Sequence, residues 1–268
     1  MKKFLLALQF LTIIPVKVKD AGEEDFARSR LSGRAEVGSV RAKSRVYFPL
    51  VGIIIGLLLV FFNLVTSQLM PRMVSDVFLF IFWIFITGAL HLDGLADTMD
   101  GFYASTDREK ILQVMEDTAT GAKGVAALIT LLLLKFVLLF NMEGSMKIYS
   151  LILVPTISRY FMFMATISSR PARKEGLGKL FIGKAGSVEI LISTCFIVVL
   201  GYLGFLFLPV KIVGFVAIAV GFIVTLAFVR YCDYKIGGMT GDTLGALNEI
   251  VEVATLLAVA VVSFMRGF

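Results

Sequence analysis

The sequence has 268 residues, of which 58% are hydrophobic and 17% charged, and its mean hydropathy is +0.90. Soluble domains contain about 45–50% apolar and about 25% charged residues, so this composition excludes an ordinary soluble protein and predicts an integral membrane protein. The net charge of +6 fits basic loops beside a bilayer, so we expect lipid and no nucleic acid as a partner. The two cysteines stand in no metal-binding or disulfide-framework spacing.

The chain begins with a short apolar stretch at residues 4–16, which follows two lysines. A spanning helix needs ~20 apolar residues, and stretches of ~10 to 14 are more typical of interfacial segments. No small-residue cleavage site closes this stretch, so we expect it to remain in the mature protein. The sequence therefore predicts an N-terminal interfacial helix that ends at Pro15.

Longer apolar runs follow, and each is long enough to cross a bilayer as a helix. They extend over residues 46–69, 73–92, 124–140, 148–167, 188–208, 212–229 and 244–264. The pattern predicts an all-α integral membrane protein with about seven transmembrane helices in addition to the interfacial helix. Residues 1–268 then form a single polytopic membrane domain.

The connections between these runs alternate between long and short. The long loops, at 17–45, 93–123, 168–187 and 230–243, contain eight, three, five and two Lys or Arg residues, whereas the short connections and the C-terminal end contain four. The positive-inside rule therefore places the long, polar loops on the cytoplasmic face of the cell membrane. Mixed charges and weak apolar periodicity predict that 17–45 is a mobile cytoplasmic loop.

The most informative motif is HLDGLADTMDG at residues 91–101. If the second spanning helix continues past it, Asp93, Asp97 and Asp100 fall at i, i+4 and i+7 and share one helix face. Three adjacent carboxylates repel one another, and a hard cation such as Mg²⁺ relieves that repulsion while also binding substrate phosphate. A solvated helix end is the alternative. For His91, a structural hydrogen bond and a catalytic role both remain open.

A second motif, GGMTGDTLGALNE, leads into the last spanning run. Gly238, Thr240 and Gly241 precede a helix N-terminus, where backbone N–H groups can bind phosphate. Asp242 is a candidate catalytic residue, with a helix cap as the alternative. Glu249 falls inside the apolar run, and carboxylates within a membrane are functional candidates.

Other candidate phosphate-binding residues are basic or lie in glycine-rich turns. Arg159 lies deep inside the fourth spanning run, where a guanidinium needs a carboxylate or phosphate partner. The turns either bind phosphate or are ordinary positive-inside sequence, and their candidate residues are Gly121, Lys123, Gly124, Gly176 and Gly178.

Acidic and glycine-rich motifs that gather on one membrane face favour a metal-assisted phosphoryl transfer. The competing class is a transporter linked to phosphate, whose ionisable groups should instead gather near the bilayer midplane between broken helices.

The sequence resembles the cobalamin synthase family, the adenosylcobinamide-GDP ribazoletransferases, over nearly its whole length. The resemblance rests on LDGLADTMDG at 92–101 and GDTLGA at 241–246, together with FPLVG at 48–52 and the pair Ser158-Arg159. The runner-up family, the CDP-alcohol phosphatidyltransferases, also has an Asp-Gly-x-x-Ala motif, but an Arg follows its Ala where this chain has Asp97.

The resemblance implies a Mg²⁺-dependent transferase of the late cobamide pathway. Such an enzyme joins α-ribazole or its 5′-phosphate to adenosylcobinamide-GDP, releases GMP, and forms adenosylcobalamin or its 5′-phosphate. Carried over to matching positions, it implies that Asp93, Asp97 and Asp100 bind metal and diphosphate. Asp242 and Glu249 would complete the metal site or activate the hydroxyl. The residues that would bind phosphate and substrate are Arg159, Lys123, Gly121, Gly124, Gly176, Gly178, Gly238, Thr240 and Gly241. The sequence leaves the number of metal ions and a homo-oligomeric state open.

Overall fold

The computed structural model describes residues 2–16, 43–173, 177–208 and 210–265. Gly176 and most of the loop predicted at 17–45 lie outside these residues. The regular secondary structure of the described chain is helical, apart from one isolated bridge between Pro171 and Met239. Its first elements are α1 (Lys2–Leu11), η1 (Lys43–Tyr47), α4 (Phe48–Leu69), α5 (Arg72–Ile86), α6 (Leu90–Ala104) and α7 (Arg108–Val114). The remaining elements are α8 (Ala122–Phe140), α9 (Gly144–Ser168), α10 (Leu177–Phe181), α11 (Ser187–Phe207), α12 (Val213–Ile236) and α13 (Gly241–Met265).

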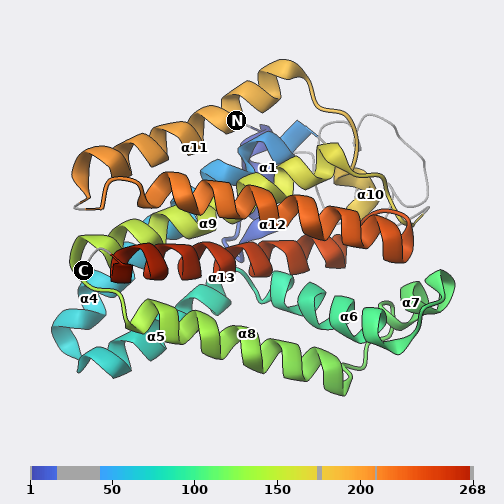
Figure 1. Ribbon diagram of the computed structural model, residues 1–268, viewed down its shortest axis with the longest axis horizontal. Coiled ribbons are helices and arrows are strands. Elements are labelled where there is room, and N and C mark those ends of the chain that lie inside the picture. The colour runs from blue at the N-terminus through green and yellow to red at the C-terminus, as the bar shows by residue number, and fades with distance from the viewer. Residues whose placement is uncertain (1, 17–42, 174–176, 209, 266–268) are drawn as a thin grey trace.

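The long helices run side by side along the longest axis of the molecule (Figure 1). Helix α9 packs against α4, α12 and α13, and 83% of its most apolar stretch is buried, against 22% for α8. Helix α4 approaches α9 closely because Gly52 and Gly56 face the α9 backbone, where a side chain would clash. Helix α9 is therefore the centre of the bundle, and its polar residues lie in the protein interior.

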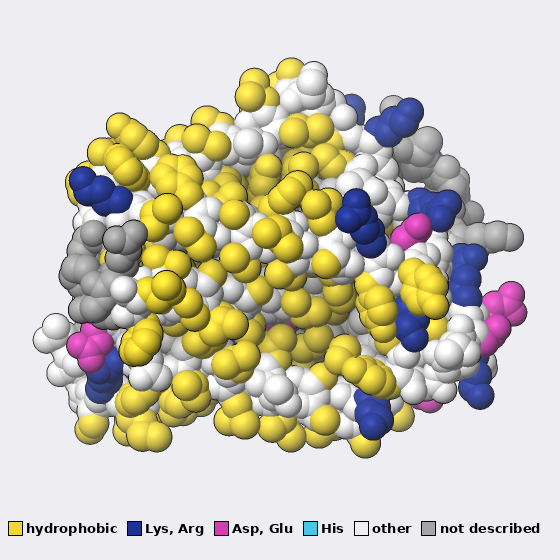
Figure 2. Space-filling view, viewed as in Figure 1, with side chains coloured by type: hydrophobic (Ala, Val, Ile, Leu, Met, Phe, Trp, Pro, Cys, Tyr) yellow, Lys and Arg dark blue, Asp and Glu magenta, His cyan; other side chains and the backbone are white. Residues whose placement is uncertain are grey.

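Among the described residues, six helices are long and apolar enough to cross a membrane: η1 with α4, α8, α9, α11, α12 and α13. They coincide with six of the seven predicted runs. On the face shown in Figure 2, hydrophobic side chains cover the middle of the molecule, and most charged residues lie toward its two ends. The composition, the helices and this apolar belt establish a multi-pass membrane protein, as predicted.

The remaining predicted span, residues 73–92, is broken. Helix α5 ends at Ile86 and α6 leaves it at an angle of 82°. Gly88 and Ala89 have φ of +60° and +54°, a left-handed conformation that interrupts an α-helix. The predicted run is therefore divided between α5 and α6, and the helix that continues past Leu92 through the three aspartates is α6. The backbone N–H of Ile13 donates to the Ile86 carbonyl at 2.9 Å, so the segment after α1 caps the end of α5.

Helix α1 ends at Leu11, four residues before the predicted end at Pro15. The Thr12 hydroxyl donates to the Leu8 carbonyl at 2.7 Å and closes the last turn. Leu6, Ala7 and Leu11 are buried, so this short helix packs one face against the protein. Its placement in the membrane interface stays a prediction.

The connections are arranged as predicted from their lengths. The polar segments between α6 and α8, α9 and α11, and α12 and α13 lie at one end of the bundle, which we call the polar end (Figure 1). The short turns and the end of α13 lie at the opposite end. That the polar end faces the cytoplasm stays a prediction.

Candidate active site

A cavity of about 210 Å³ lies at the polar end, where α6 meets the start of α13. Its polar wall comes from α6, α13 and the segment after α9, and includes His91, Asp93, Arg173, Thr240 and Asp242. Its apolar wall comes mainly from α1, α4, α9 and α10, and includes Phe10, Phe48, Met162, Phe181 and Leu244. Both charged and hydrophobic side chains therefore line this cavity.

Helix α6 supplies the predicted aspartates. Asp93 is exposed on the cavity wall, and Asp97 and Asp100 are partly buried on the same helix, at the expected spacing. Asp242 joins them from α13, because Gly94 lets the α13 backbone approach: a Cβ on Gly94 would lie 2.7 Å from the Asp242 carbonyl oxygen. Asp97 experiences the charges of Asp93, Asp100 and Asp242, with Arg173 as the opposing cation. Four carboxylates from two helices are therefore concentrated beside the cavity.

Asp100 is held by the start of α8. Its carboxylate accepts backbone N–H groups from Gly121 at 2.7 Å and from Gly124 at 2.9 Å. A side chain on either glycine would clash with this carboxylate. The predicted phosphate-binding N–H groups of these glycines are thus bonded to Asp100, which satisfies unpaired donors of the α8 N-terminus. Lys123 is exposed beside them.

The α13 N-terminus is organised by two threonines. The Thr240 N–H donates to the Thr243 hydroxyl oxygen at 2.8 Å, and the Thr243 N–H donates to the Thr240 hydroxyl oxygen at 3.2 Å. Thr240 is therefore the helix cap, and Asp242 is left within the first turn, where its carboxylate accepts from the Thr240 hydroxyl at 3.2 Å. Gly178 of α10 packs against the backbone of Gly241, and both glycines line the cavity. Gly238 does not line the cavity, since it packs against the Arg170 backbone.

Arg173 is a site residue that the sequence alone did not single out. Its guanidinium lies 3.4 Å from Asp242 and 3.4 Å from Glu116, and it donates to the Leu112 carbonyl at 3.0 Å. It is the cationic side chain among the described residues that line the cavity. In the sequence it is one of several basic residues in a loop, so nothing distinguished it from ordinary positive-inside sequence.

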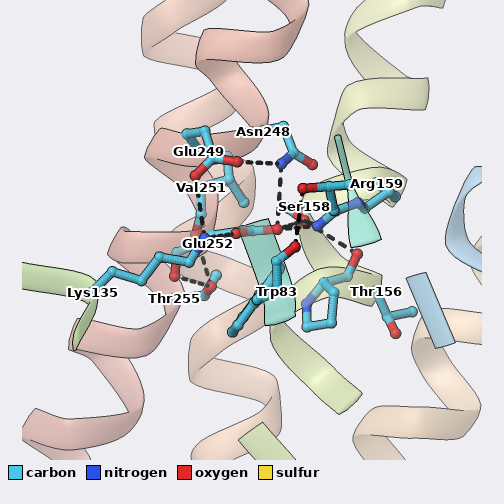
Figure 3. Close-up of polar contacts among 12 residues, drawn as sticks. Trp83, Lys135, Thr156, Ser158, Arg159, Asn248, Glu249, Val251, Glu252 and Thr255 are labelled. Carbon is cyan, nitrogen blue, oxygen red and sulfur yellow. Dashed lines mark hydrogen bonds and ion pairs between the residues drawn. The ribbon is translucent and has the colours of Figure 1, made fainter. Parts of the chain in front are cut away.

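Arg159 and Glu249 do not line the cavity. They belong to a buried charge cluster formed by Lys135 of α8, Arg159 of α9, and Glu249 and Glu252 of α13 (Figure 3). Glu252 pairs with both Arg159 and Lys135, and the Lys135 ammonium also lies 3.2 Å from Glu249 and 4.2 Å from the Trp83 ring centroid. Two cations and two anions leave the cluster neutral, which a low-dielectric interior requires.

Uncharged groups complete this cluster. The Asn248 amide donates to Glu249 and Glu252 at 3.3 Å each, and the Ser158 hydroxyl donates to Glu252 at 3.3 Å. All of these residues are buried, so the cluster joins α8, α9 and α13 inside the bundle. Lys135, like Arg173, was missed, because a lysine near the end of a spanning run is expected to extend to the interface.

His91 lies in the first turn of α6 on the cavity wall, and only 3% of its surface is exposed. Neither ring nitrogen has a hydrogen-bond partner among the residues that the structure describes. Gly245 of α13 packs against the His91 backbone, with a Cβ position 3.2 Å from the His91 Cα. The structural hydrogen bond that the sequence left open is therefore not formed within this part of the chain.

Within the described residues, no group of three or more His, Cys, Asp or Glu side chains converges closely enough to hold a metal ion. Asp93, Asp97, Asp100 and Asp242 nonetheless lie near one another on α6 and α13, and their oxygens are the ligand type that Mg²⁺ prefers. As they stand, they would hold a cation jointly with oxygen ligands from a substrate or water.

A helical membrane protein with a carboxylate-rich cavity at one end can be compared with known families. The model of the family described as cobalamin-5-phosphate synthase matches residues 3–260. This chain belongs to the cobalamin-5-phosphate synthase family. The match includes all four aspartates described above and the whole of the buried charge cluster.

Curated relatives agree with this family. A protein of Geotalea daltonii is 37% identical over 263 residues, which cover 98% of each chain. Proteins of Thermoanaerobacter sp. and Clostridioides difficile are 35% and 33% identical, over 98% and 99% of each chain. All three relatives are named adenosylcobinamide-GDP ribazoletransferase. No solved structure matches the chain.

Proposed function

We propose that this chain joins α-ribazole or its 5′-phosphate to adenosylcobinamide-GDP and releases GMP. In this transfer a ribazole hydroxyl oxygen bonds to the phosphorus that bears the cobinamide, and the bond from that phosphorus to the GMP oxygen breaks. The observation that carries the proposal is the family match over residues 3–260. The cavity supports it, because carboxylates, a guanidinium and a helix N-terminus meet there, as phosphoryl transfer requires.

The proposed cofactor is Mg²⁺, held by Asp93, Asp97 and Asp100 with Asp242 beside them. The donor set fits this ion, because the carboxylates around Asp97 outnumber the one opposing cation, Arg173. Each Asp100 oxygen accepts one N–H bond and retains a lone pair for a cation or its water. When bound, Mg²⁺ would neutralise charge on the diphosphate and orient it.

Residues of this chain would bind the phosphates and move the proton. Arg173 is placed to bind phosphate oxygens, together with the α13 N-terminus at Thr240 and Gly241. Asp242 is the candidate acceptor for the hydroxyl proton, since it lines the cavity. Lys123 at the start of α8 would attract the anionic donor from outside the cavity.

Arg159 and Glu249 would act differently from the sequence expectation. Because they lie in the buried charge cluster, we propose that they position α13, and with it Asp242, relative to α8 and α9. They are positioning residues in this scheme, without contact to the substrate. The proposed location is the cytoplasmic membrane, with the polar end in the cytoplasm.

The testing experiment measures GMP release by purified protein in detergent with adenosylcobinamide-GDP, α-ribazole and Mg²⁺. We expect Asp97→Asn to lower turnover at least 100-fold, because the amide loses a charge at the centre of the carboxylates. Asp117→Asn, an exposed acid of the same connection, is the matched control and should retain turnover.

Metal-dependent GMP and cobamide formation that Asp97→Asn abolishes would support both the reaction and the site. Near-normal turnover of that variant at saturating Mg²⁺ would overturn the metal assignment. A folded wild-type protein that forms no product, yet releases CMP from a CDP-alcohol, would overturn the substrate assignment. Release of neither nucleotide would overturn the enzyme assignment and favour transport.

A further inference from the structure

The hydrophobic wall of the cavity is built from aromatic rings of three separate segments. Phe10 of α1, Phe48 of α4 and Phe181 of α10 lie with ring centroids 4.5 to 6.1 Å apart. Met162 and Leu244 extend this surface, and both are almost fully buried. Phosphoryl transfer has no use for such a wall, because phosphate and metal are both strongly hydrated. The wall therefore points to a flat, apolar part of a substrate.

The size of the cavity restricts which part that is. An apolar cavity of about 150 Å³ is known to hold one benzene ring. The present cavity of about 210 Å³ has room for a bicyclic aromatic system. A corrin ring is several times larger and cannot enter. The cavity can hold one heterocyclic base, from either the acceptor nucleoside or the guanine of the donor.

The apolar character of the aromatic wall decides between these two bases. Guanine carries several donors and acceptors, and the aromatic wall offers no partner for them. A benzimidazole-type base, once attached to ribose, has a single polar atom, the free ring nitrogen, which is an acceptor. Such a base therefore loses fewer hydrogen bonds than guanine when it lies against a wall of apolar side chains.

We infer that the hydrophobic wall binds the bicyclic aromatic base of the acceptor nucleoside. Asp93 and Asp242 line the same cavity and are the carboxylates available to the ribose hydroxyls. This inference rests on the proposed function, because it assigns one substrate of that reaction to one side of the cavity.

The first experiment varies the aromatic wall. Phe10 is half-buried on α1, so Phe10→Ala should remove a ring from the cavity without disrupting the core. We expect it to raise KM for α-ribazole about tenfold and to leave KM for adenosylcobinamide-GDP unchanged. Phe4→Ala is the matched control, since Phe4 is also half-buried on α1 but packs against Tyr47 and does not line the cavity. A rise in KM for adenosylcobinamide-GDP instead would assign the wall to the donor and overturn the inference.

A second measurement separates failure of this inference from failure of the proposed function. Equilibrium dialysis with labelled α-ribazole and no donor measures binding without turnover. If the protein releases no GMP but binds α-ribazole, and Phe10→Ala weakens that binding, the proposed reaction fails and the base site stands. If GMP is released and Phe10→Ala changes neither binding nor KM for α-ribazole, the reaction stands and the base site fails.

Discussion

Glu252 shows how this bundle accommodates charge in its interior. Its carboxylate has no exposed surface and accepts from Lys135, Arg159, Asn248 and Ser158. A buried ion pair contributes little net stability compared with well-packed hydrophobic residues, but a buried charge without its partner is strongly unfavourable. These residues are therefore interdependent, and single substitutions should be more harmful than paired ones.

We expect Glu252→Gln to lower the free energy of unfolding by about 3–5 kcal/mol, because Lys135 and Arg159 would then share one carboxylate. Thermal unfolding in detergent, followed by fluorescence of Trp83, measures the change, since this one tryptophan lies against Lys135. The control is Asp233→Asn, which breaks an exposed pair with Arg170 and should change stability by less than about 1 kcal/mol.

Adding Arg159→Met to Glu252→Gln restores a neutral cluster of Lys135 and Glu249. The double variant should therefore be more stable than Glu252→Gln alone. If the free energy of unfolding of the double variant falls by the sum of the losses in Arg159→Met and Glu252→Gln, charge balance does not govern this cluster.

At the scale of elements, the site depends on where α6 lies relative to α13. The left-handed Gly88 and Ala89 end α5 and redirect the chain, so that the first turn of α6, which carries Asp93, lies beside Asp242. A straight helix would have continued along α5 and carried the aspartates away from the α13 N-terminus. Gly94 then permits the close approach of the two backbones.

Gly94→Ala should lower turnover at least tenfold, because the added methyl would lie 2.7 Å from the Asp242 carbonyl oxygen and 3.0 Å from its Cα. These are backbone atoms, so α13 must shift away from α6. The control is Gly201→Ala on α11, where the nearest atom is the mobile end of the Ile218 side chain at 3.2 Å. Both variants are assayed for GMP release and for thermal unfolding. If Gly94→Ala and Gly201→Ala both retain the turnover of the wild type, the close approach of α6 and α13 is not critical for the reaction.

At the scale of the whole molecule, an apolar belt separates two polar ends of unequal size (Figure 2). The polar end holds the cavity, the carboxylates and the long connections, whereas the opposite end consists of short turns. Arg72, Glu143, Lys147 and Asp76 form ion pairs at that opposite end and connect the α4–α5 and α8–α9 turns. The candidate site therefore lies at one end of the molecule, and ion pairs between turns lie at the other.

Cysteine labelling in cells tests which end faces the cytoplasm. With the native cysteines replaced, Thr106→Cys at the polar end should react only with membrane-permeant thiol reagents. Asn141→Cys at the opposite end should also react with impermeant reagents. Both positions are exposed, so access to the residue itself is matched. Labelling of Thr106→Cys alone by an impermeant reagent would reverse the proposed orientation.

The sequence by itself determined the membrane class, six of the spanning helices, the alternation of long and short connections, and the family. These features depend on local composition and spacing: about 20 apolar residues form a spanning helix whatever surrounds them. The spacing of Asp93, Asp97 and Asp100 could also be predicted from the sequence, because it is a property of one helix.

Only the tertiary structure decided which charges meet. Lys135 and Arg159 are far apart in the sequence, yet both reach Glu252, and Asp100 is bonded to the start of α8 through Gly121 and Gly124. Arg173 lies at the site, although the sequence did not single it out. Arg159 and Glu249, which were expected at the site, lie in the interior of the bundle. Pairing between helices depends on how closely their backbones approach and at what angle. Those distances are set by packing around glycines and by the bend after α5, and no local pattern in the sequence encodes them.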